Sequence, residues 1–162
     1  MLAIPLDGGR TFRGRRLLGD NKTWRGFAVM VPAAGLAFGL LAWLVEIFLG
    51  GAATAGLWPL PLWQYFLLGL WTGFFFMAGE LPNSFLKRQL GVAPGAAPER
   101  PWAKVLSFVL DRFDSVIGLL ASAACFVATP WQLWLILLLG GSAVHWLFSV
   151  LLYVFGVKKR PA

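Results

Sequence analysis

The amino-acid sequence predicts an all-α integral membrane protein with about four transmembrane helices. Of its 162 residues, 59% are hydrophobic and only 13% are charged, and the chain contains nine Trp and fourteen Phe. Soluble domains carry more charge and fewer large aromatic residues. A membrane helix needs roughly 20 mostly apolar residues, and four segments of about that length stand out. We therefore expect a single membrane-embedded domain over residues 1–162.

Loops rich in helix-breaking residues separate the four predicted helices. The helices are expected at residues 24–49, 62–78, 103–128 and 131–155. Gly and Pro dominate the first loop, "GGAATAGLWPLPLW", and the dipeptide "TP" at 129–130 is typical of a tight turn. Two glycine pairs have the G-x-x-x-G spacing at which membrane helices approach closely: Gly35 with Gly39, and Gly69 with Gly73. We expect both pairs to pack within the protein.

The basic residues predict the orientation of the chain. Every Lys and Arg lies in the N-terminal stretch, in residues 87–112, or in the tail at residues 158–160. With four crossings, all three regions fall on one side, and basic residues favour the cytoplasmic side. We expect a multi-pass protein of the cell (inner or plasma) membrane with both termini cytoplasmic. The net charge of +7 then faces anionic lipid headgroups, and no nucleic-acid partner is expected.

Three acidic residues, Glu80, Asp111 and Asp114, lie at or inside the cytoplasmic ends of predicted helices. An unpaired carboxylate in such a position costs about 3 kcal/mol or more. Spacings of four, three and four residues place Ser107 and Gly118 on the same helix face as the two aspartates. Antiparallel neighbours would bring Glu80 to the depth of Asp111. Because carboxylate oxygens suit Mg²⁺, we interpret the three acids as its ligands.

Two further expectations concern the same region. Pro82 in "GELPNSFLKR" should break or kink the second helix just after Glu80. The alternative to a metal site is a set of structural ion pairs in which basic residues neutralise the acids. The candidates for those pairs are Lys87, Arg88 and Arg112. Spacing alone leaves both interpretations open.

The N-terminal stretch "PLDGGRTFRGRRLLGDNKTWRG" has the composition of a phosphate-binding loop. It contains five glycines and six basic residues. Glycine lets backbone amides turn toward an anion, and Lys and Arg supply positive charge. Its segment "GRRLLGDNKT" is not a P-loop, because Asp20 and Asn21 intervene before Lys22 and no apolar strand precedes it. The alternative is an ordinary juxtamembrane basic stretch, which explains the arginines but not the glycines.

Three motifs in order resemble one family. "PLDGGRTFRGRRLLGDNKTWRG", "GELPNSFLKRQLG" and "LDRFDSVIG" are similar to the motif set of the CDP-archaeol synthases, members of the phosphatidate cytidylyltransferase superfamily. The resemblance covers nearly the whole chain from Pro5. Each motif lies at a predicted cytoplasmic helix end, so the set is far more specific than any single motif.

The resemblance implies a magnesium-dependent nucleotidyltransferase of phospholipid biosynthesis. Such an enzyme transfers CMP from CTP to a membrane lipid phosphate, archaetidic acid-like or phosphatidic acid-like, and releases pyrophosphate. The implied CTP-binding residues are Gly19, Asn21, Lys22, Thr23, Arg25 and Ser84. The implied catalytic residues are Lys22, Lys87, Arg88, Asp111 and Asp114, with Glu80, Asp111 and Asp114 as the metal ligands. Residues 1–23 would form the nucleotide-binding loop, and residues 87–103 a second cytoplasmic loop.

The chain departs from the family pattern in three ways. Glu80 stands where the family usually has Asp, and it is followed by a "LP" dipeptide. The family usually has a membrane helix before "PLDGG", so we expect that helix to be lost or to lie upstream. The segment "GVAPGAAPERPW" lacks the Gly/His-rich stretch of the bacterial phosphatidate enzymes, which favours the archaeol-type branch.

Two other functional classes are alternatives to the enzyme. A CDP-alcohol phosphotransferase is disfavoured, because its long "DG…AR…G…D…D" pattern is absent from the sequence. A non-enzymatic polytopic protein, such as a small transporter or assembly factor, would use the acids to line a polar cavity. Only the enzyme interpretation predicts stabilisation by CTP that requires Mg²⁺. The sequence does not indicate an oligomeric state.

Overall fold

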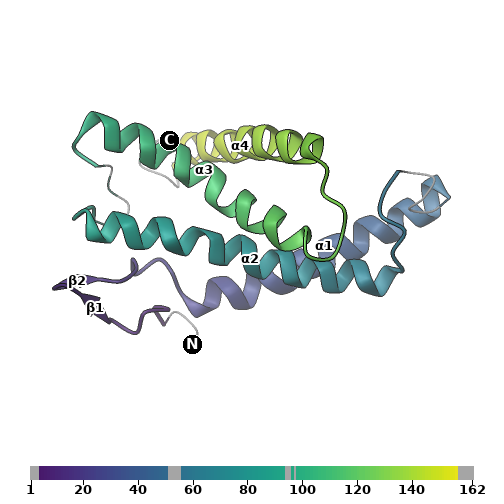
Figure 1. Ribbon diagram of the computed structural model, residues 1–162, viewed down its shortest axis with the longest axis horizontal. Coiled ribbons are helices and arrows are strands. Elements are labelled where there is room, and N and C mark those ends of the chain that lie inside the picture. Colours follow the sequence, from purple (N-terminus) through teal and green to yellow (C-terminus); the bar gives the residue numbers. More distant parts are fainter. Residues whose placement is uncertain (1–3, 51–55, 94–95, 97, 157–162) are drawn as a thin grey trace.

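Four α-helices and a short β-hairpin make up the described part of the chain (Figure 1). The computed structural model describes residues 4–50, 56–93, 96 and 98–156. In chain order the elements are β1 (Thr11–Phe12), β2 (Arg15–Arg16), α1 (Trp24–Leu49), α2 (Leu62–Gln89), α3 (Pro101–Ala123) and α4 (Trp131–Val154). All four predicted helices form, and α1 has the predicted bounds. The third predicted helix ends earlier than expected, at Ala123.

Helices α1 and α2 lie side by side along the long axis of the molecule (Figure 1). A Cβ atom added at Gly69 would lie 2.6 Å from the carbonyl oxygen of Ala34, and one at Gly73 would lie 2.6 Å from the Ala34 Cβ. On the α1 side, a Cβ at Gly35 would lie 2.7 Å from a methyl group of Leu70. Larger residues would therefore push the helices apart. The expectation that the glycine pairs pack within the protein is confirmed.

Helix α3 packs against the other end of α2 through a second glycine contact. A Cβ at Gly118 would clash with the carbonyl oxygen of Phe75, and one at Gly79 would lie 2.6 Å from that of Asp114. Because the neighbouring atoms belong to the backbone, they cannot move aside as a side chain can. The contact places Asp114 of α3 directly beside the α2 residue that precedes Glu80.

Pro82 was expected to break or kink the second helix, and of these two effects the break is wrong. Helix α2 passes through Pro82 and ends at Gln89. A proline removes one helical hydrogen bond, and membrane helices tolerate this loss where neighbouring elements pack around the site. Because the helix continues, Asn83 and Lys87 follow Glu80 on one helix face.

The connection between α2 and α3 is consequently shorter than the predicted loop at 87–103. Residues 87–89 still belong to α2, and α3 begins at Pro101. Lys87 is therefore part of a helix, where its side chain has a defined direction. Proline suits the first turn of α3, because the N–H that it lacks would have no helical partner there.

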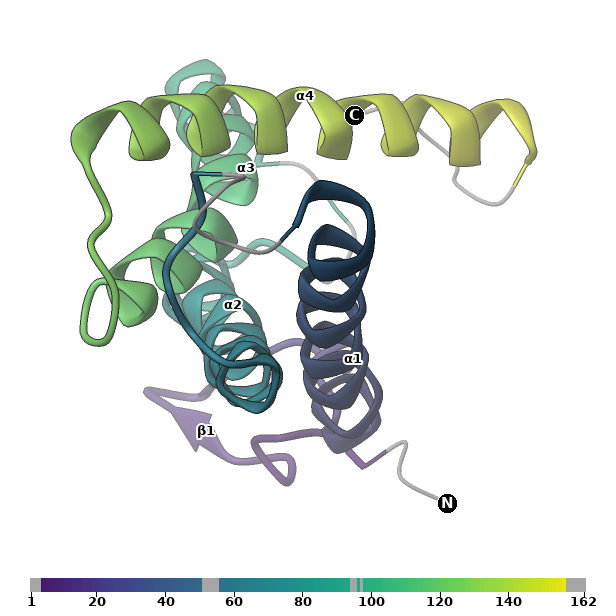
Figure 2. The same ribbon diagram turned by 90° about the vertical axis from the view of Figure 1, so that its right-hand side faces the viewer.

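Helix α4 runs across the α1 and α2 pair instead of alongside it (Figure 2). It contacts α3, where a Cβ at Gly141 would lie 3.3 Å from a methyl group of Val116. By length and composition, three helices of the described residues can cross a membrane: α1, α2 and α4. Helix α3 carries Lys104, Asp111, Arg112 and Asp114. The crossing by α3 therefore stays a prediction.

The β-hairpin lies at the same end of the molecule as the end of α2 and the start of α3 (Figure 1). Strands β1 and β2 pair antiparallel, and the turn between them uses Arg13 and Gly14 with φ angles of 52° and 75°. Two of the three basic regions thus meet at one end, as the charge distribution predicted. The third, at residues 158–160, lies outside the described residues, and the cytoplasmic placement of this end stays a prediction.

The glycine contact between α2 and α3 leads to a stability prediction. Gly118→Ala should lower the free energy of unfolding by about 1–3 kcal/mol, as expected for overpacking against atoms that cannot move. The matched control is Gly140→Ala, because a Cβ there meets nothing within 4 Å. Thermal unfolding in detergent measures both variants. Equal stability of the two would contradict the close approach.

Candidate active site

One amide group holds the carboxylates of Asp111 and Asp114 together. Asn83, a buried residue of α2, donates hydrogen bonds from Nδ2 to Asp111 Oδ1 at 2.7 Å and to Asp114 Oδ2 at 2.8 Å. The amide has two protons, one for each carboxylate. Asn83 reaches both acids because α2 stays helical beyond Pro82. Asp111 and Asp114 therefore lie on one face of α3 that is directed toward α2, as the spacing predicted.

Glu80 joins the same cluster through a buried serine. The Oγ atom of Ser115 lies 3.0 Å from Glu80 Oε1 and 3.1 Å from Asp114 Oδ1. A hydroxyl has one proton, so it donates to one carboxylate at a time. The backbone N–H of Ser115 also donates to Asp114 Oδ1, at 2.6 Å. The structure thus brings Glu80, Asp111 and Asp114 into one hydrogen-bonded network.

Lys22 connects the N-terminal loop to this network. Its Nζ atom donates to Glu80 Oε2 in an ion pair whose side chains are only 16% and 27% exposed. The backbone turn that presents Lys22 is closed by a hydrogen bond from its N–H to the Gly19 carbonyl, 2.9 Å long. A residue assigned to CTP and a residue assigned to the metal therefore lie in direct contact.

The ion-pair alternative explains part of the cluster. Lys87 donates to both carboxylate oxygens of Asp111, at 2.6 Å for Oδ2. Arg112 instead donates to the carbonyl of Phe108 and lies over its ring, 3.3 Å from the centroid. The Nε and Nη1 atoms of Arg88 are buried, and neither has a hydrogen-bond partner among the described residues. Of the three expected basic partners, only Lys87 forms an ion pair with one of these acids among the described residues.

The cluster has an excess of negative charge. Glu80 and Asp111 each pair with one ammonium group. Asp114 receives hydrogen bonds from Asn83 and Ser115, and no cation pairs with it among the residues described.

A divalent cation fits this charge balance, and the donor set is all oxygen, as Mg²⁺ prefers. Within the described ranges, however, no three His, Cys, Asp or Glu side chains form a preassembled metal group. The Asn83 amide bridges Asp111 and Asp114, and the two lysines pair with Glu80 and Asp111. The assignment of Glu80, Asp111 and Asp114 as metal ligands stays a prediction.

The other residues assigned to CTP surround the start of α1 and the end of α2. Thr23 precedes α1 and pairs with Pro5 in an isolated β-bridge. Arg25 lies exposed in the first turn of α1, and Ser84 follows Asn83 on α2. Asn21 is exposed beside Lys22. Their contacts with a nucleotide stay predictions.

Comparisons with known proteins agree with these motifs. A family model described as CarS-like, CDP-archaeol synthase, matches residues 3–161. The chain belongs to the CDP-archaeol synthase family. The family comprises CTP-dependent cytidylyltransferases of lipid biosynthesis, and this chain is such an enzyme.

Curated members of the family match the chain over nearly its full length. The CDP-archaeol synthase of Halobacterium salinarum is 37% identical, over 97% of this chain and 82% of the relative. That of Methanoculleus marisnigri is 34% identical, over 97% of this chain and 89% of the relative. That of Thermococcus gammatolerans is 33% identical, over 97% of this chain and 81% of the relative. No solved structure matches the chain.

Asp7 organises the N-terminal loop of this family member, and sequence reasoning missed it. Its side chain is 1% exposed. It accepts hydrogen bonds from the backbone N–H groups of Gly9 and Leu18, each at 3.0 Å, and from Arg16 at 2.6 and 3.3 Å. These bonds join the beginning of the loop to its end. Burial raises the pKa of Asp7, but the hydrogen bonds from Arg16 and the two amides outweigh it and hold the pKa below its usual value.

Three contacts fix the loop on α2. Arg15 donates to the carbonyl of Gln89, and the Gln89 side chain donates to the carbonyl of Arg16 at 3.3 Å. The rings of Phe12 and Phe85 lie 6.1 Å apart. Together with the ion pair of Lys22, these contacts hold the glycine-rich loop against the carboxylate cluster.

Asn83 and Ser115 are also functional candidates that the sequence reasoning missed. Asn83 lies three residues after Glu80 in "ELPN", and Ser115 follows Asp114 directly. A polar residue one helical turn from an acid was the available signal for Asn83. Because a break was expected at Pro82, Asn83 was not placed on the same helix face as Glu80.

Asp7→Asn should loosen the N-terminal loop. Asparagine has nearly the same shape but lacks the charge, so about 1.5–3 kcal/mol of loop stability should be lost. Limited trypsin digestion at the loop arginines should then be faster, and the KM for CTP should rise. Asp20→Asn is the matched control, because Asp20 is 69% exposed and has a single ion pair with Arg16. Equal digestion of both variants would contradict the role of Asp7.

The stabilisation of the N-terminal loop by Asp7 should be lost at acidic pH. The folded-state pKa of Asp7 lies below its usual value, which is about 3.9. The stabilisation is therefore complete above that pH and is lost as pH falls through the lowered pKa. In thermal unfolding, the wild type should approach the stability of Asp7→Asn only in that acidic range. Convergence near neutral pH would exclude the charge as the cause.

Proposed function

We propose that the chain transfers CMP from CTP to the phosphate of a membrane lipid, forming a CDP-lipid and pyrophosphate. The names of the relatives point to an archaeol-type lipid, and a phosphatidic acid-like lipid is the second candidate. The observation that carries the proposal is the contact of Lys22 with Glu80. It joins a glycine-rich cationic loop to a carboxylate cluster that carries excess negative charge.

The reaction needs positioning and charge neutralisation more than proton transfer. A lipid phosphate oxygen attacks the α-phosphorus of CTP, and the bond from that phosphorus to the oxygen bridging to the β-phosphorus breaks. The attacking phosphate is already ionised near neutral pH, because its second pKa is about 6. No general base is therefore required. The barrier is lowered by holding the two anions in line while pyrophosphate leaves.

Glu80, Asp111 and Asp114 are the residues that would hold Mg²⁺. When bound, Mg²⁺ supplies positive charge to the triphosphate and to the departing pyrophosphate. Lys22 and Lys87 now neutralise two of these acids, and each ammonium has three protons. Each lysine can therefore keep one carboxylate contact and donate another hydrogen bond to a phosphate. This arrangement suits a site that is to receive a polyanion.

Arg88 is the proposed partner of a substrate phosphate. Two of its guanidinium nitrogens are buried and have no hydrogen-bond partner among the described residues. Buried N–H groups without an acceptor are costly, and a phosphate would satisfy them with charge-assisted hydrogen bonds. Gly19, Asn21, Thr23, Arg25 and Ser84 are proposed to contact the CTP, as the motif positions imply.

The decisive experiment follows radiolabel from α-labelled CTP into an organic-extractable lipid. Purified wild-type protein with Mg²⁺ should label a lipid phosphate, and parallel reactions with ether-linked and ester-linked acceptors identify the preferred class. Asp114→Asn should reduce transfer by about 100-fold or more, since it removes a carboxylate from the reacting centre. Removal of Mg²⁺ with EDTA should also abolish transfer.

Glu46→Gln is the matched control for the loss of a carboxylate, because Glu46 lies near the opposite end of α1. It should retain activity, and both variants should remain folded in detergent. Near-normal transfer by folded Asp114→Asn would exclude the carboxylate assignment. Absence of any labelled lipid with the wild type would contradict the proposed reaction for this chain.

A further inference from the structure

A partly enclosed pocket of about 270 Å³ lies where α1 ends and α2 begins, at the end of this helix pair opposite to the carboxylate cluster (Figure 1). Trp43 and Glu46 of α1 and Tyr65 of α2 line it, together with Ala, Leu and Pro side chains. Trp43 and Glu46 are three residues apart, so they share one face of α1. The pocket therefore combines one carboxylate with two aromatic rings on otherwise apolar walls.

Glu46 has no cationic partner at this end of the chain. Its side chain forms no ion pair or hydrogen bond with any residue that the structure describes. The sequence contains no Lys, Arg or His between Arg25 and Lys87. An ionisable side chain in a helix that is apolar enough to cross a membrane is a functional candidate by default. A cation that pairs with Glu46 would come from outside these segments.

The backbone around the pocket leaves its net charge negative. Glu46 lies in the last turn of α1, where the helix dipole places about half a negative charge and cations are stabilising. That turn contains no basic residue. The start of α2 contributes about half a positive charge, which offsets the dipole of α1. The full charge of Glu46 therefore remains uncompensated.

Hydrogen bonds fix the aromatic side of the pocket. Tyr65 is only 5% exposed, and its hydroxyl donates to the carbonyl of Trp58. The Nε1 atom of Trp58 donates in turn to the carbonyl of Ala128 at 2.7 Å. These bonds join the connection between α1 and α2 to the segment before α4, so the ring of Tyr65 is held in place. The pocket therefore does not have to be assembled by its ligand.

We propose that this pocket binds a quaternary ammonium group, carried by a small molecule or by a lipid headgroup. Aromatic ring faces attract cations, and quaternary ammonium ligands are recognised in this way. Glu46 supplies the opposite charge. A divalent metal ion fits poorly, because it needs about six oxygen ligands and the pocket offers one carboxylate. The inference goes beyond the proposed cytidylyl transfer and does not depend on it.

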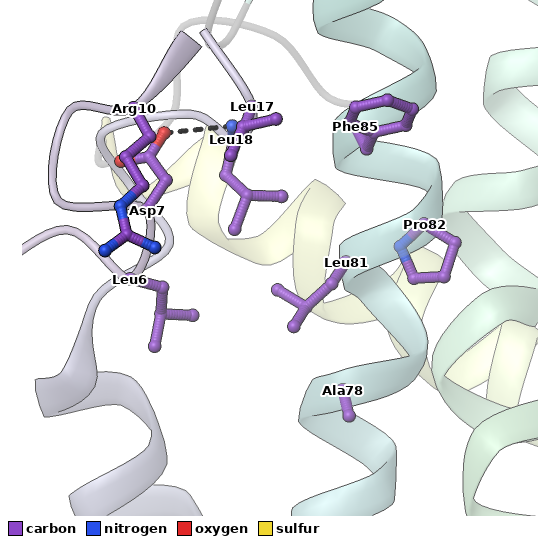
Figure 3. Close-up of a pocket in the computed structure, with 9 residues that line it drawn as sticks. All are labelled: Leu6, Asp7, Arg10, Leu17, Leu18, Ala78, Leu81, Pro82 and Phe85. Atoms are coloured by element: carbon purple, nitrogen blue, oxygen red, sulfur yellow. Dashed lines mark hydrogen bonds between the residues drawn. The ribbon is translucent and has the colours of Figure 1, made fainter. Parts of the chain in front are cut away.

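A larger groove of about 550 Å³ between the N-terminal loop and α2 lacks this property (Figure 3). Its only carboxylate belongs to Asp7, and both oxygens accept hydrogen bonds from Arg16 and from backbone N–H groups. Arg10 also lines this groove. Its charge is thus already balanced, whereas that of the pocket at Glu46 is not.

Equilibrium dialysis with radiolabelled choline tests the pocket in the wild-type protein in an uncharged detergent. Choline should bind saturably, with one molecule per chain. Its neutral analogue, in which carbon replaces the nitrogen, should compete about tenfold less well or worse, because it has the same shape but no charge. Sodium chloride at matched ionic strength should compete little. Equal competition by the neutral analogue would overturn the proposal.

Two variants locate the binding site. Glu46→Gln should weaken choline binding about fivefold through loss of the charge, and Trp43→Leu about threefold or more through loss of a ring face. The matched controls are Glu99→Gln and Trp63→Leu, because both residues are exposed and neither lines the pocket. Thermal unfolding checks that each variant is folded. Unchanged choline binding in folded Glu46→Gln would refute the pocket as the site.

A lipid experiment distinguishes the two sources of the ammonium group. The wild type is placed in nanodiscs of equal phosphatidylcholine and phosphatidylglycerol, and the lipids retained after transfer to detergent are counted by mass spectrometry. Retention of phosphatidylcholine that is lost in Glu46→Gln would identify a headgroup. Choline binding without such retention would identify a small molecule.

Absence of both saturable choline binding and selective phosphatidylcholine retention would overturn the proposal. None of these measurements requires CTP, Mg²⁺ or turnover. The binding results therefore stand whether or not the chain carries out cytidylyl transfer, and a failure of the pocket would leave the proposed function intact.

Discussion

Carboxylates packed between two helices of a membrane protein require compensation, and the rest of the site depends on this constraint. Glu80, Asp111 and Asp114 lie where α2 meets α3, and the side chain of Glu80 is only 27% exposed. Asn83 and Ser115 satisfy part of their hydrogen-bonding capacity, and Lys22 and Lys87 neutralise part of their charge. Because Asp114 has no ion-pair partner among the described residues, we propose that the cluster binds an added cation.

Backbone proximity makes this cluster possible. The contact of Gly79 with α3 allows the two helices to approach until their polar side chains share hydrogen bonds. The same stretch of α2 also contacts the N-terminal loop, through Glu80, Phe85 and Gln89. Asp7 gives that loop a fixed shape although it contains little regular structure. The loop, the end of α2 and the start of α3 therefore lie together at one end of the molecule (Figure 1).

Much of this arrangement was predictable from the sequence, and the exceptions have physical reasons. Long apolar segments between Gly and Pro loops identified the helices, and the spacing of Asp111 and Asp114 placed both on one face. The passage of α2 through Pro82 was not predictable, because propensity cannot show that packing compensates a lost hydrogen bond. The roles of Asp7 and Asn83 depend on partners distant in sequence, and so does the direction of α4.

The central claim is that the loop and the carboxylates form a single site for CTP and Mg²⁺. Thermal unfolding with each ligand alone and with both together tests it most directly. We expect CTP to stabilise the wild type strongly only when Mg²⁺ is present, with a joint shift larger than the sum of the separate shifts. Lys22→Ala should reduce this joint shift, and Lys104→Ala should not. Equal stabilisation by CTP in Mg²⁺ and in EDTA, or no stabilisation under either condition, would exclude a shared site.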